Sequence, residues 1–293
     1  MRYSKEKEPL KPEVFEMKLQ YLGTAAAEAW PALFCECDAC QKARAAGGRN
    51  IRSRSQAIID DALLIDFPPD TYYHCMQHGV NLTRVENMLV THAHSDHWYP
   101  ADLWCRYPGI AHFKGDSCPL NIWGTAAIKD DVEAHLTPAN RLDERLCYHE
   151  IQPFGTYTVD KYTVTALPAN HDPAAKPVIY QISDGEKTML YGNDTGYPFE
   201  SVWEYWEKNP VRFDYVSLDC TGVTLQGYRD GHMCVDINAE VVERMRAMGL
   251  VDDATTVCIH HFSHNGGLTY DELTEEVAPR GWLVSYDGMV VEI

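Results

Sequence analysis

Histidine and aspartate side chains are concentrated in one short segment of the chain, THAHSDHWYP at residues 91–100. Side chains alternate along an extended segment, so His92, His94 and Asp96 can point to one side. A bend at the end of the segment would turn His97 toward the same place. Imidazole and carboxylate groups bind zinc and similar divalent metals. The segment therefore predicts ligands for two adjacent cations, in preference to a solvated polar loop.

Three further candidate ligands follow strand-like segments elsewhere in the chain. His171 follows TVTALPAN, Asp194 follows MLYGN, and His261 follows TTVCIH. Each alone is more often an ordinary loop or core residue, but a two-metal centre needs more ligands than one loop supplies. Two divalent ions about 3.5–4 Å apart can lower the pKa of a bridging water from ~15.7 toward ~7, so that hydroxide becomes the nucleophile. The spacing is thus compatible with hydrolysis that uses no serine or cysteine nucleophile.

A second cluster of metal-binding side chains lies nearer the N-terminus. Cys35, Cys37 and Cys40 form C-x-C-x-x-C within ALFCECDACQKAR. Three thiolates need a fourth ligand to complete a tetrahedral structural zinc site, and His264, three residues after His261, is the candidate. We therefore predict one structural zinc ion that fixes the loop beside the active site. Reduced surface cysteines and a redox role are the alternatives.

Composition restricts the compartment and the partners. No run reaches the ~18 apolar residues of a membrane helix. Residues 1–16, which are charged and contain prolines, do not resemble a secretory signal. We therefore expect a cytoplasmic protein without a membrane partner, whose ten cysteines are thiols or metal ligands. The formal net charge of −18 disfavours long nucleic acid, whereas a small-molecule anion held by metal stays open as a substrate, as does a homodimer.

Short apolar and β-branched runs bounded by turn residues predict a strand-rich chain. These runs occupy residues 17–24, 55–66, 86–91, 119–123, 162–167, 177–183, 187–191, 213–219 and 255–260. The pair Asp60 and Asp61 inside the second run predicts a hairpin. Several of the runs end just before a histidine or aspartate, which places the candidate ligands at strand ends.

Helical periodicity occurs at 125–136 and at 235–249. No internal repeat and no low-complexity linker divides the chain. We therefore predict one α/β domain over residues 17–293, with two packed sheets and the helices outside them. Residues 1–16 would form an N-terminal arm.

The motifs HAHSDH, NHD, YGNDTG and HHFSH, in this order, resemble those of the metallo-β-lactamase superfamily over essentially the whole chain. The resemblance implies a four-layer αββα sandwich with the metals at the sheet edges. It implies two sets of metal ligands and one bridge: His92, His94 and His171; Asp96, His97 and His261; and Asp194 between them. It also places Asp66, in LLIDFP, behind the metal loop as a support. The oxygen-reducing branch has Glu where this chain has His94, which favours hydrolysis.

Within that superfamily, the chain resembles the cyclic phosphodiesterase branch that accompanies the bacterial carbon-phosphorus lyase pathway. A similar cysteine cluster occurs in the pyrroloquinoline-quinone biosynthesis branch. The resemblance implies that His232, in GHM, contacts the phosphate and protonates the leaving group, and we expect Asp219 to orient its imidazole. We count Asp96 with these two as catalytic. The LGTG opening of the branch is LGTAAAEAW here, and we expect Glu28 and Trp30 to lie near the substrate.

The sequence therefore predicts a metal-dependent hydrolase, and more specifically a phosphodiesterase that acts on a small phosphate ester, cyclic esters included. Zinc or manganese would occupy the active site, with iron as a further option, because the same nitrogen and oxygen ligands accept all three. Two alternatives stay open. One is hydrolysis of a carboxylic ester, lactone or amide at the same centre, and the other is a non-catalytic, metal-binding partner in a biosynthetic pathway.

Overall fold

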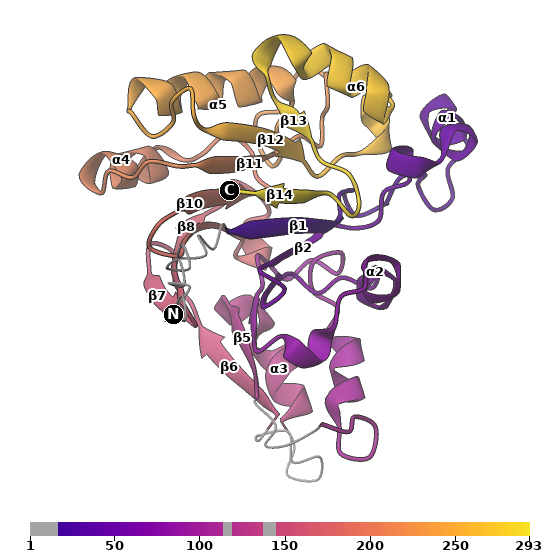
Figure 1. Ribbon diagram of the computed structural model, residues 1–293, viewed down its shortest axis with the longest axis vertical. Coiled ribbons are helices and arrows are strands. Elements are labelled where there is room, and N and C mark those ends of the chain that lie inside the picture. The colour runs from indigo at the N-terminus through magenta and orange to yellow at the C-terminus, as the bar shows by residue number, and fades with distance from the viewer. Residues whose placement is uncertain (1–16, 114–118, 137–144) are drawn as a thin grey trace, which may run out of the picture.

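The computed structural model describes residues 17–113, 119–136 and 145–293, and the expected arm at 1–16 lies outside this range. The described chain forms two seven-stranded sheets that pack face to face, with helices on both outer faces (Figure 1). The expected four-layer αββα sandwich is confirmed by this arrangement.

The first sheet has the strand order β14-β1-β2-β3-β4-β5-β6. Its strands are β1 (Lys18–Gly23), β2 (Gln56–Ile59), β3 (Leu63–Ile65), β4 (Asn87–Leu89), β5 (Leu120–Gly124), β6 (Leu146–Glu150) and β14 (Val290–Glu292). Strands β2 and β3 pair antiparallel, with Ile59 opposite Leu63. Asp60 and Asp61 make the turn between them at φ 51° and 55°, as a type I′ hairpin requires. The predicted hairpin is therefore confirmed.

The second sheet has the strand order β13-β12-β11-β10-β9-β8-β7. Its strands are β7 (Thr156–Val159), β8 (Tyr162–Pro168), β9 (Val178–Ser183), β10 (Thr188–Gly192), β11 (Tyr215–Asp219), β12 (Thr256–His260) and β13 (Leu283–Val284). Strands β10 to β13 are parallel. Strands β8 and β10 both pair antiparallel with β9, so they run in the same direction. The ends of β8, β10, β11 and β12 therefore lie at one edge of the sheet.

The helices cover the outer faces of the two sheets. They are α1 (Asp38–Ala46), α2 (Thr71–His78), α3 (Lys129–His135), α4 (Glu200–Lys208), α5 (Val235–Ala247) and α6 (Tyr270–Val277). Short 3-10 helices are η1 (Gly48–Asn50), η2 (Leu82–Arg84), η3 (Pro100–Arg106), η4 (Ala126–Ile128), η6 (Pro173–Ala175), η7 (His264–Gly266) and η8 (Ala278–Arg280). In Figure 1, α4, α5 and α6 lie over the second sheet and α2 and α3 over the first. None of the described helices is long and apolar enough to cross a membrane.

The main core lies between the two sheets. Leu19, Tyr21 and Ile59 from the first sheet pack with Tyr180 and Tyr191 from the second, and all five are buried. Burial of a large apolar side chain contributes roughly 1.5–3 kcal/mol relative to exposure. Packed strands of this kind hold their ends in place, so the loops that follow them start from fixed positions.

Candidate metal centre

The loops that carry the candidate ligands meet at one edge of the sandwich. His171, Asp194 and His261 follow β8, β10 and β12, whose ends share an edge of the second sheet. The loop after β4 brings residues 92–97 to the same place from the first sheet. Thr91, just before His92, accepts a hydrogen bond at its carbonyl from the backbone N–H of Val178 in β9 at 3.0 Å. This bond ties the two sheets together at the site.

The first ligand set combines two histidines of the loop after β4 with one from the loop after β8. His92 Nε2 lies 3.0 Å from His94 Nδ1, and His171 Nε2 lies 3.1 Å from the same nitrogen. His92 Nε2 also lies 3.2 Å from Asp194 Oδ2. A tetrahedral zinc ion with bonds of 2.0–2.1 Å places neighbouring ligand atoms about 3.3 Å apart. The four side chains therefore fit the ligand shell of one such ion.

The second ligand set shares Asp194 with the first. His97 Nε2 lies 3.3 Å from His261 Nε2, 3.3 Å from Asp96 Oδ2 and 3.2 Å from Asp194 Oδ2. Asp194 Oδ1 is buried and accepts no hydrogen bond of favourable geometry from the described residues, although His232 Nδ1 is 3.1 Å away. A buried carboxylate oxygen without a donor is costly unless a cation satisfies it. The donor set thus fits two divalent ions bridged by one carboxylate.

Three residues of the site have a left-handed backbone. Asp66, Asp194 and His261 have φ values of 66°, 55° and 63°. Aspartate and histidine tolerate this region better than most residues, but it still costs about 1–3 kcal/mol where the surroundings enforce it. In each case the chain turns sharply just after a strand, which keeps the side chain at the sheet edge.

Asp66 holds the metal-binding loop from behind, where we expected it. Its Oδ2 lies 2.7 Å from His97 Nδ1, and its Oδ1 accepts a hydrogen bond from the backbone N–H of Thr91 at 2.8 Å. The carboxylate is fully buried. A His97 ring that donates Nδ1–H to Asp66 presents the lone pair of Nε2 to the centre. This arrangement fixes both the orientation and the tautomer of the ligand.

Thr221 plays the corresponding part for His261, and sequence analysis did not single it out. His261 Nδ1 lies 2.8 Å from Thr221 Oγ1, which donates to Asp219 Oδ2 at 3.0 Å. Asp219 Oδ1 also accepts from the backbone N–H of Met233 at 2.8 Å. A threonine has no sequence signal for such a role. Its only clue is its place two residues after the end of β11.

Asp219 lies near His232, whose imidazole we expected it to orient, but it is not the only carboxylate there. The distance from its Oδ2 to His232 Nδ1 is 3.4 Å, whereas Asp194 Oδ1 is nearer to that nitrogen at 3.1 Å. Asp219 is also fully buried behind Thr221. Asp219 therefore lies behind Thr221, His261 and His232, where it can position these side chains but does not line the cavity.

The charges at the centre suit a cation. Burial, with His97 next, lowers the pKa of His92 to about 4, so its ring is neutral and free to bind metal at pH 7. Burial alone would raise the pKa of Asp194, but His261 and His232 hold it well below its ordinary value. Burial would also raise the pKa of Asp96, which His97 lowers instead. Both carboxylates are therefore ionised at neutral pH.

A cavity of about 340 Å³ opens onto the centre. Ligands His94, Asp96 and Asp194 line it together with Glu28, Tyr228 and His232. Glu28, which we expected near the substrate, thus lines the cavity at the candidate metal ligands. His232 enters the wall because Tyr197, just after the Asp194 turn, donates its N–H to the carbonyl of Arg229 at 2.7 Å, three residues before His232.

Trp30 does not line this cavity, so the expectation that it lies near the substrate is wrong. Its side chain is buried in a cluster with Cys40 and Phe262, and its Nε1 donates to the carbonyl of Ala39 at 3.3 Å. The residue instead anchors the loop that carries Glu28, because its backbone exchanges two hydrogen bonds with Arg52.

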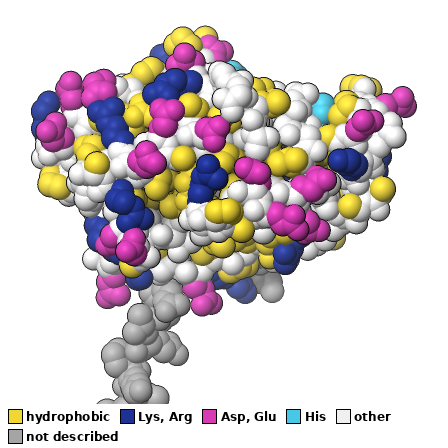
Figure 2. All heavy atoms as spheres, turned by 90° about the horizontal axis from the view of Figure 1, so that it is seen from above, with side chains coloured by type: hydrophobic (Ala, Val, Ile, Leu, Met, Phe, Trp, Pro, Cys, Tyr) yellow, Lys and Arg dark blue, Asp and Glu magenta, His cyan; other side chains and the backbone are white. Residues whose placement is uncertain are grey.

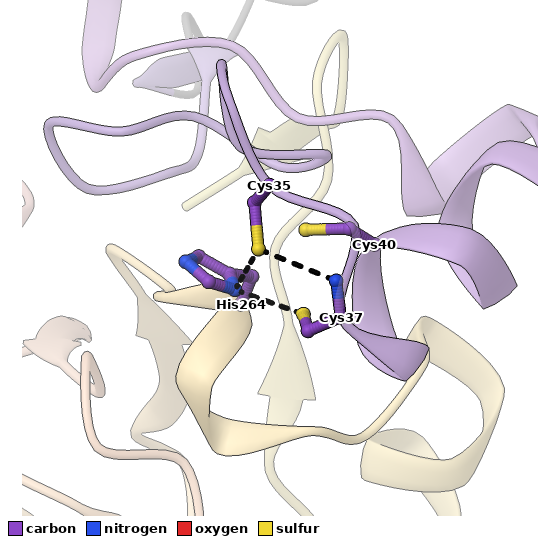
Figure 3. A group of neighbouring side chains, drawn as sticks. All are labelled: Cys35, Cys37, Cys40 and His264. Carbon is purple, nitrogen blue, oxygen red and sulfur yellow. Dashed lines mark hydrogen bonds between the residues drawn. The ribbon is translucent and has the colours of Figure 1, made fainter.

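The cysteine cluster and His264 come together as a separate group (Figure 3). Cys35 and Cys37 precede α1, Cys40 lies in its first turn, and His264 begins η7. The Sγ atoms of Cys35 and Cys37 lie 3.8 and 3.4 Å from His264 Nδ1. Zinc bonds of about 2.3 Å to sulfur and 2.0–2.1 Å to nitrogen predict about 3.6 Å for this separation. The four side chains therefore fit one tetrahedral zinc ion.

Two thiols of the cluster have shifted pKa values. The backbone N–H of Cys40 and the ring of His264 lower the pKa of Cys37 to about 6, whereas burial raises the pKa of Cys40 to about 11. Cys37 is therefore largely thiolate at pH 7, and thiolate is the form that binds metal.

Comparisons with known proteins agree with this geometry. Residues 63–262, more than half of the chain, match the profile of the beta-lactamase superfamily domain. Ribonuclease Z from Listeria monocytogenes serotype 4b is 28% identical over 131 residues, which cover 42% of this chain. That match spans only 41% of the length of the relative.

Solved structures share the fold over nearly the whole chain. A diphosphatase of the PhnP family has a TM-score of 0.71 at 17% identity, covering 95% of this chain and 98% of its own. Zinc-bound PqqB from Methylobacterium extorquens has a TM-score of 0.67 at 18% identity, covering 94% and 100%. The profile match, together with this shared fold, confirms that the chain belongs to the metallo-β-lactamase superfamily.

Proposed function

We propose that the protein is a metal-dependent hydrolase that cleaves small phosphodiesters, cyclic ones included. The observation that carries the proposal is the pair of ligand sets that share Asp194, with ligand atoms 3.0 to 3.3 Å apart at the floor of a cavity. The ribonuclease relative supports cleavage of a phosphodiester, the bond that a ribonuclease cuts. The diphosphatase neighbour is named for a different bond to phosphorus, the phosphoanhydride, and so supports hydrolysis at phosphorus more generally.

The two ligand sets would hold divalent ions of zinc, manganese or iron. Such a pair supplies an activated water at neutral pH and stabilises the entering and leaving oxygens of a displacement. The chain itself fixes the ligands: Asp66 orients His97, and Thr221 orients His261. The rings therefore need little reorganisation when a substrate arrives. The cysteine cluster would hold a further, structural zinc ion.

His232 is placed to handle the leaving group. Burial would lower its pKa, but the neighbouring carboxylates of Asp194 and Asp219 raise it to about 11. Its Nδ1 faces these two carboxylates, so the other ring nitrogen is left for the cavity that the residue lines. A proton held there can pass to a departing alkoxide oxygen, and a positioned acid commonly contributes ~10²–10⁴ in rate.

The surface argues for a small substrate over long RNA, despite the similarity to ribonuclease Z. None of the described residues that line the cavity is lysine or arginine. The arginines on or near α5 are paired with carboxylates, for example Arg244 with Glu200 and Arg229 with Glu240. Figure 2, which views the molecule from the side of α5 and α6, shows basic and acidic side chains interspersed. Phosphate-backbone binding instead requires clustered basic groups.

A substrate panel tests the proposal directly. Protein purified without chelator and reloaded with zinc, manganese or iron should hydrolyse bis(4-nitrophenyl) phosphate with a kcat/KM far above that for 4-nitrophenyl acetate or lactones. The opposite preference would favour a carboxylic ester, lactone or amide hydrolase on the same centre. Two bound metals without turnover of any ester would favour a non-catalytic metal-binding partner.

A further inference from the structure

We propose that the substrate carries an organic ammonium group close to its phosphate, and that Glu28 and Tyr228 recognise this cation. The inference rests on the proposed phosphodiesterase function and names the substrate class of the same cavity. It starts from a feature that the metal chemistry does not use, a carboxylate in the wall of the cavity that the phosphate would enter.

Glu28 is held firmly at the cavity. Its Oε1 accepts a hydrogen bond from Ser263 Oγ at 2.5 Å, and its side chain remains 33% exposed. The loop on which it lies is pinned at Ala26, whose N–H donates to the carbonyl of Phe262 at 3.0 Å, and at Trp30. The carboxylate therefore cannot swing away from an incoming ligand without breaking these contacts.

The charge of Glu28 is not neutralised by its neighbours. His264 is the one basic side chain within 4 Å of the Glu28 carboxylate among the described residues; its Nε2 is 3.9 Å away and its Nδ1 faces the cysteine cluster. No lysine or arginine is among the described lining residues. The phosphate would be met by the metal ions and His232, so a purely anionic ester would only be repelled by Glu28. A ligand with a positive group beside its phosphate would be attracted twice, by the metal ions and His232 at its phosphate and by Glu28 at its cation.

Tyr228 supplies the second half of a cation site. Its ring lies against Gly222 so closely that a Cβ at that position would meet Tyr228 Cγ at 2.5 Å, and it lines the same cavity as Glu28. The face of an aromatic ring attracts ammonium groups. A carboxylate and an aromatic ring in one cavity form the chemistry that selects an organic ammonium over a neutral alkyl group of equal size.

A simpler role for Glu28 would be to support Ser263 between His261 and His264. The variant Glu28→Gln separates the two roles, because the amide keeps an acceptor oxygen for Ser263 Oγ and removes only the negative charge. Glu36→Gln is the matched control: it removes one charge from an exposed position of the same loop, outside the cavity.

Calorimetric titration of the zinc-loaded, full-length protein tests the inference without turnover. The probes are phosphocholine and its carbon analogue 3,3-dimethylbutyl phosphate, in which a neutral tert-butyl group replaces the trimethylammonium group. We expect wild type and Glu36→Gln to bind phosphocholine about 10-fold more tightly than 3,3-dimethylbutyl phosphate. In Glu28→Gln the Kd values for the two probes should agree within about 2-fold. Tyr228→Leu should lose about 3-fold of the preference and Tyr228→Phe should keep it. Phosphoethanolamine, titrated in parallel, distinguishes a primary from a quaternary ammonium.

Equal affinity of wild type for the two probes, or no binding of phosphocholine, would overturn the inference. If Glu28→Gln still prefers phosphocholine, Glu28 does not recognise the ammonium group. Turnover of bis(4-nitrophenyl) phosphate is measured separately on the same preparations. If wild type does not turn over this ester, the phosphodiesterase proposal is refuted. The ratio of the two probe affinities still decides whether the cavity recognises an ammonium group.

Discussion

The two candidate metal sites lie close together but are built in opposite ways. The His/Asp centre gathers mostly buried side chains from residue 92 to residue 261, and Asp66 holds the ring of His97 from behind. The cysteine site takes three ligands from six consecutive residues at the start of α1, and Cys37 is exposed. Its fourth ligand, His264, comes from the turn that also carries His261.

This difference indicates what each metal contributes. The sandwich brings the ligands of the His/Asp centre together, so metal binding there depends on the fold more than the fold depends on the metal. Residues 33–37, which carry two of the cysteines, are exposed or half-buried, so zinc would fasten this part of the loop to η7. Through Ser263 and Glu28, that loop also forms part of the cavity wall. Changes at the first site should therefore affect chemistry, and changes at the second should affect stability.

The largest effect is expected at the shared bridge. Asp194→Ala should lose at least one active-site metal and nearly all hydrolysis, a drop of about 10³-fold or more in kcat/KM, because no neighbouring side chain can bridge both ion positions. Elemental analysis and assay of the loaded variant measure both effects. Asp253→Ala, at an exposed carboxylate, is the control. Retention of both metals would remove the bridging role.

His232→Ala separates chemistry from metal binding. The variant should keep full metal content and yet slow esters with alkoxide leaving groups by about 10²–10⁴-fold. Nitrophenyl esters should slow much less, because a phenolate needs little protonation. The ratio of kcat between the two ester types is the measurement. An equal loss on both would leave His232 as a binding residue, and no loss on either would make it structural.

Asp66→Asn tests whether the buried carboxylate behind His97 supports the His/Asp centre without affecting the exposed cysteine site. The amide preserves the shape of the side chain but weakens the hold on His97 Nδ1, so metal affinity at the second ligand set should fall about 10–100-fold. Competition with a chromogenic chelator measures the affinity. The zinc of the cysteine cluster should be unaffected, and an equal loss from both sites would show that the variant has damaged the fold in general.

Cys37→Ser is expected to have the smallest effect on chemistry. It should release one zinc ion, lower the Tm by a few degrees and leave the active-site pair bound, because serine is a poor zinc ligand and the sandwich core is untouched. Each kcal/mol lost corresponds to about 2–4 °C in a protein of this size class. Thermal unfolding and zinc content are the measurements. An unchanged stoichiometry would mean that these thiols do not bind zinc.

The central strands of both sheets were predictable, and the edges were not. The runs at 162–167 and 177–183 match β8 and β9, whose buried apolar side chains give a strong signal. The four strands missed, β6, β7, β13 and β14, are the four edge strands. An edge strand is partly exposed, and so its sequence is mixed; β7 has exposed residues at two of its four positions.

The helices, too, were predicted only where the sequence shows a clear helical periodicity. The helix predicted at 235–249 is α5, and the one predicted at 125–136 is divided into η4 and α3. Helices α1, α2, α4 and α6 were missed. The capping box of Thr269 and Glu272 at the start of α6 could have revealed that helix, since the pattern is readable in sequence.

Residue type determined which parts of the site could be predicted. Histidine and aspartate clusters suggest metal binding by their chemistry alone, and the structure brings all seven expected ligands together. Thr221 and Tyr228 carry no such signal, because their roles arise only when distant segments meet. Trp30 was misplaced for the same reason: proximity in sequence to Glu28 does not say which side chain faces the cavity.

The most direct test of the account is the metal content of the chain. Protein purified without chelator and loaded with zinc should hold three ions per chain, of which Cys37→Ser lacks one and Asp194→Ala lacks at least one other. Activity should follow the pair that depends on Asp194 and not the ion that depends on Cys37. A single ion per chain in wild type, or activity that is lost with the cysteine-bound zinc and retained in Asp194→Ala, would contradict the two-metal centre.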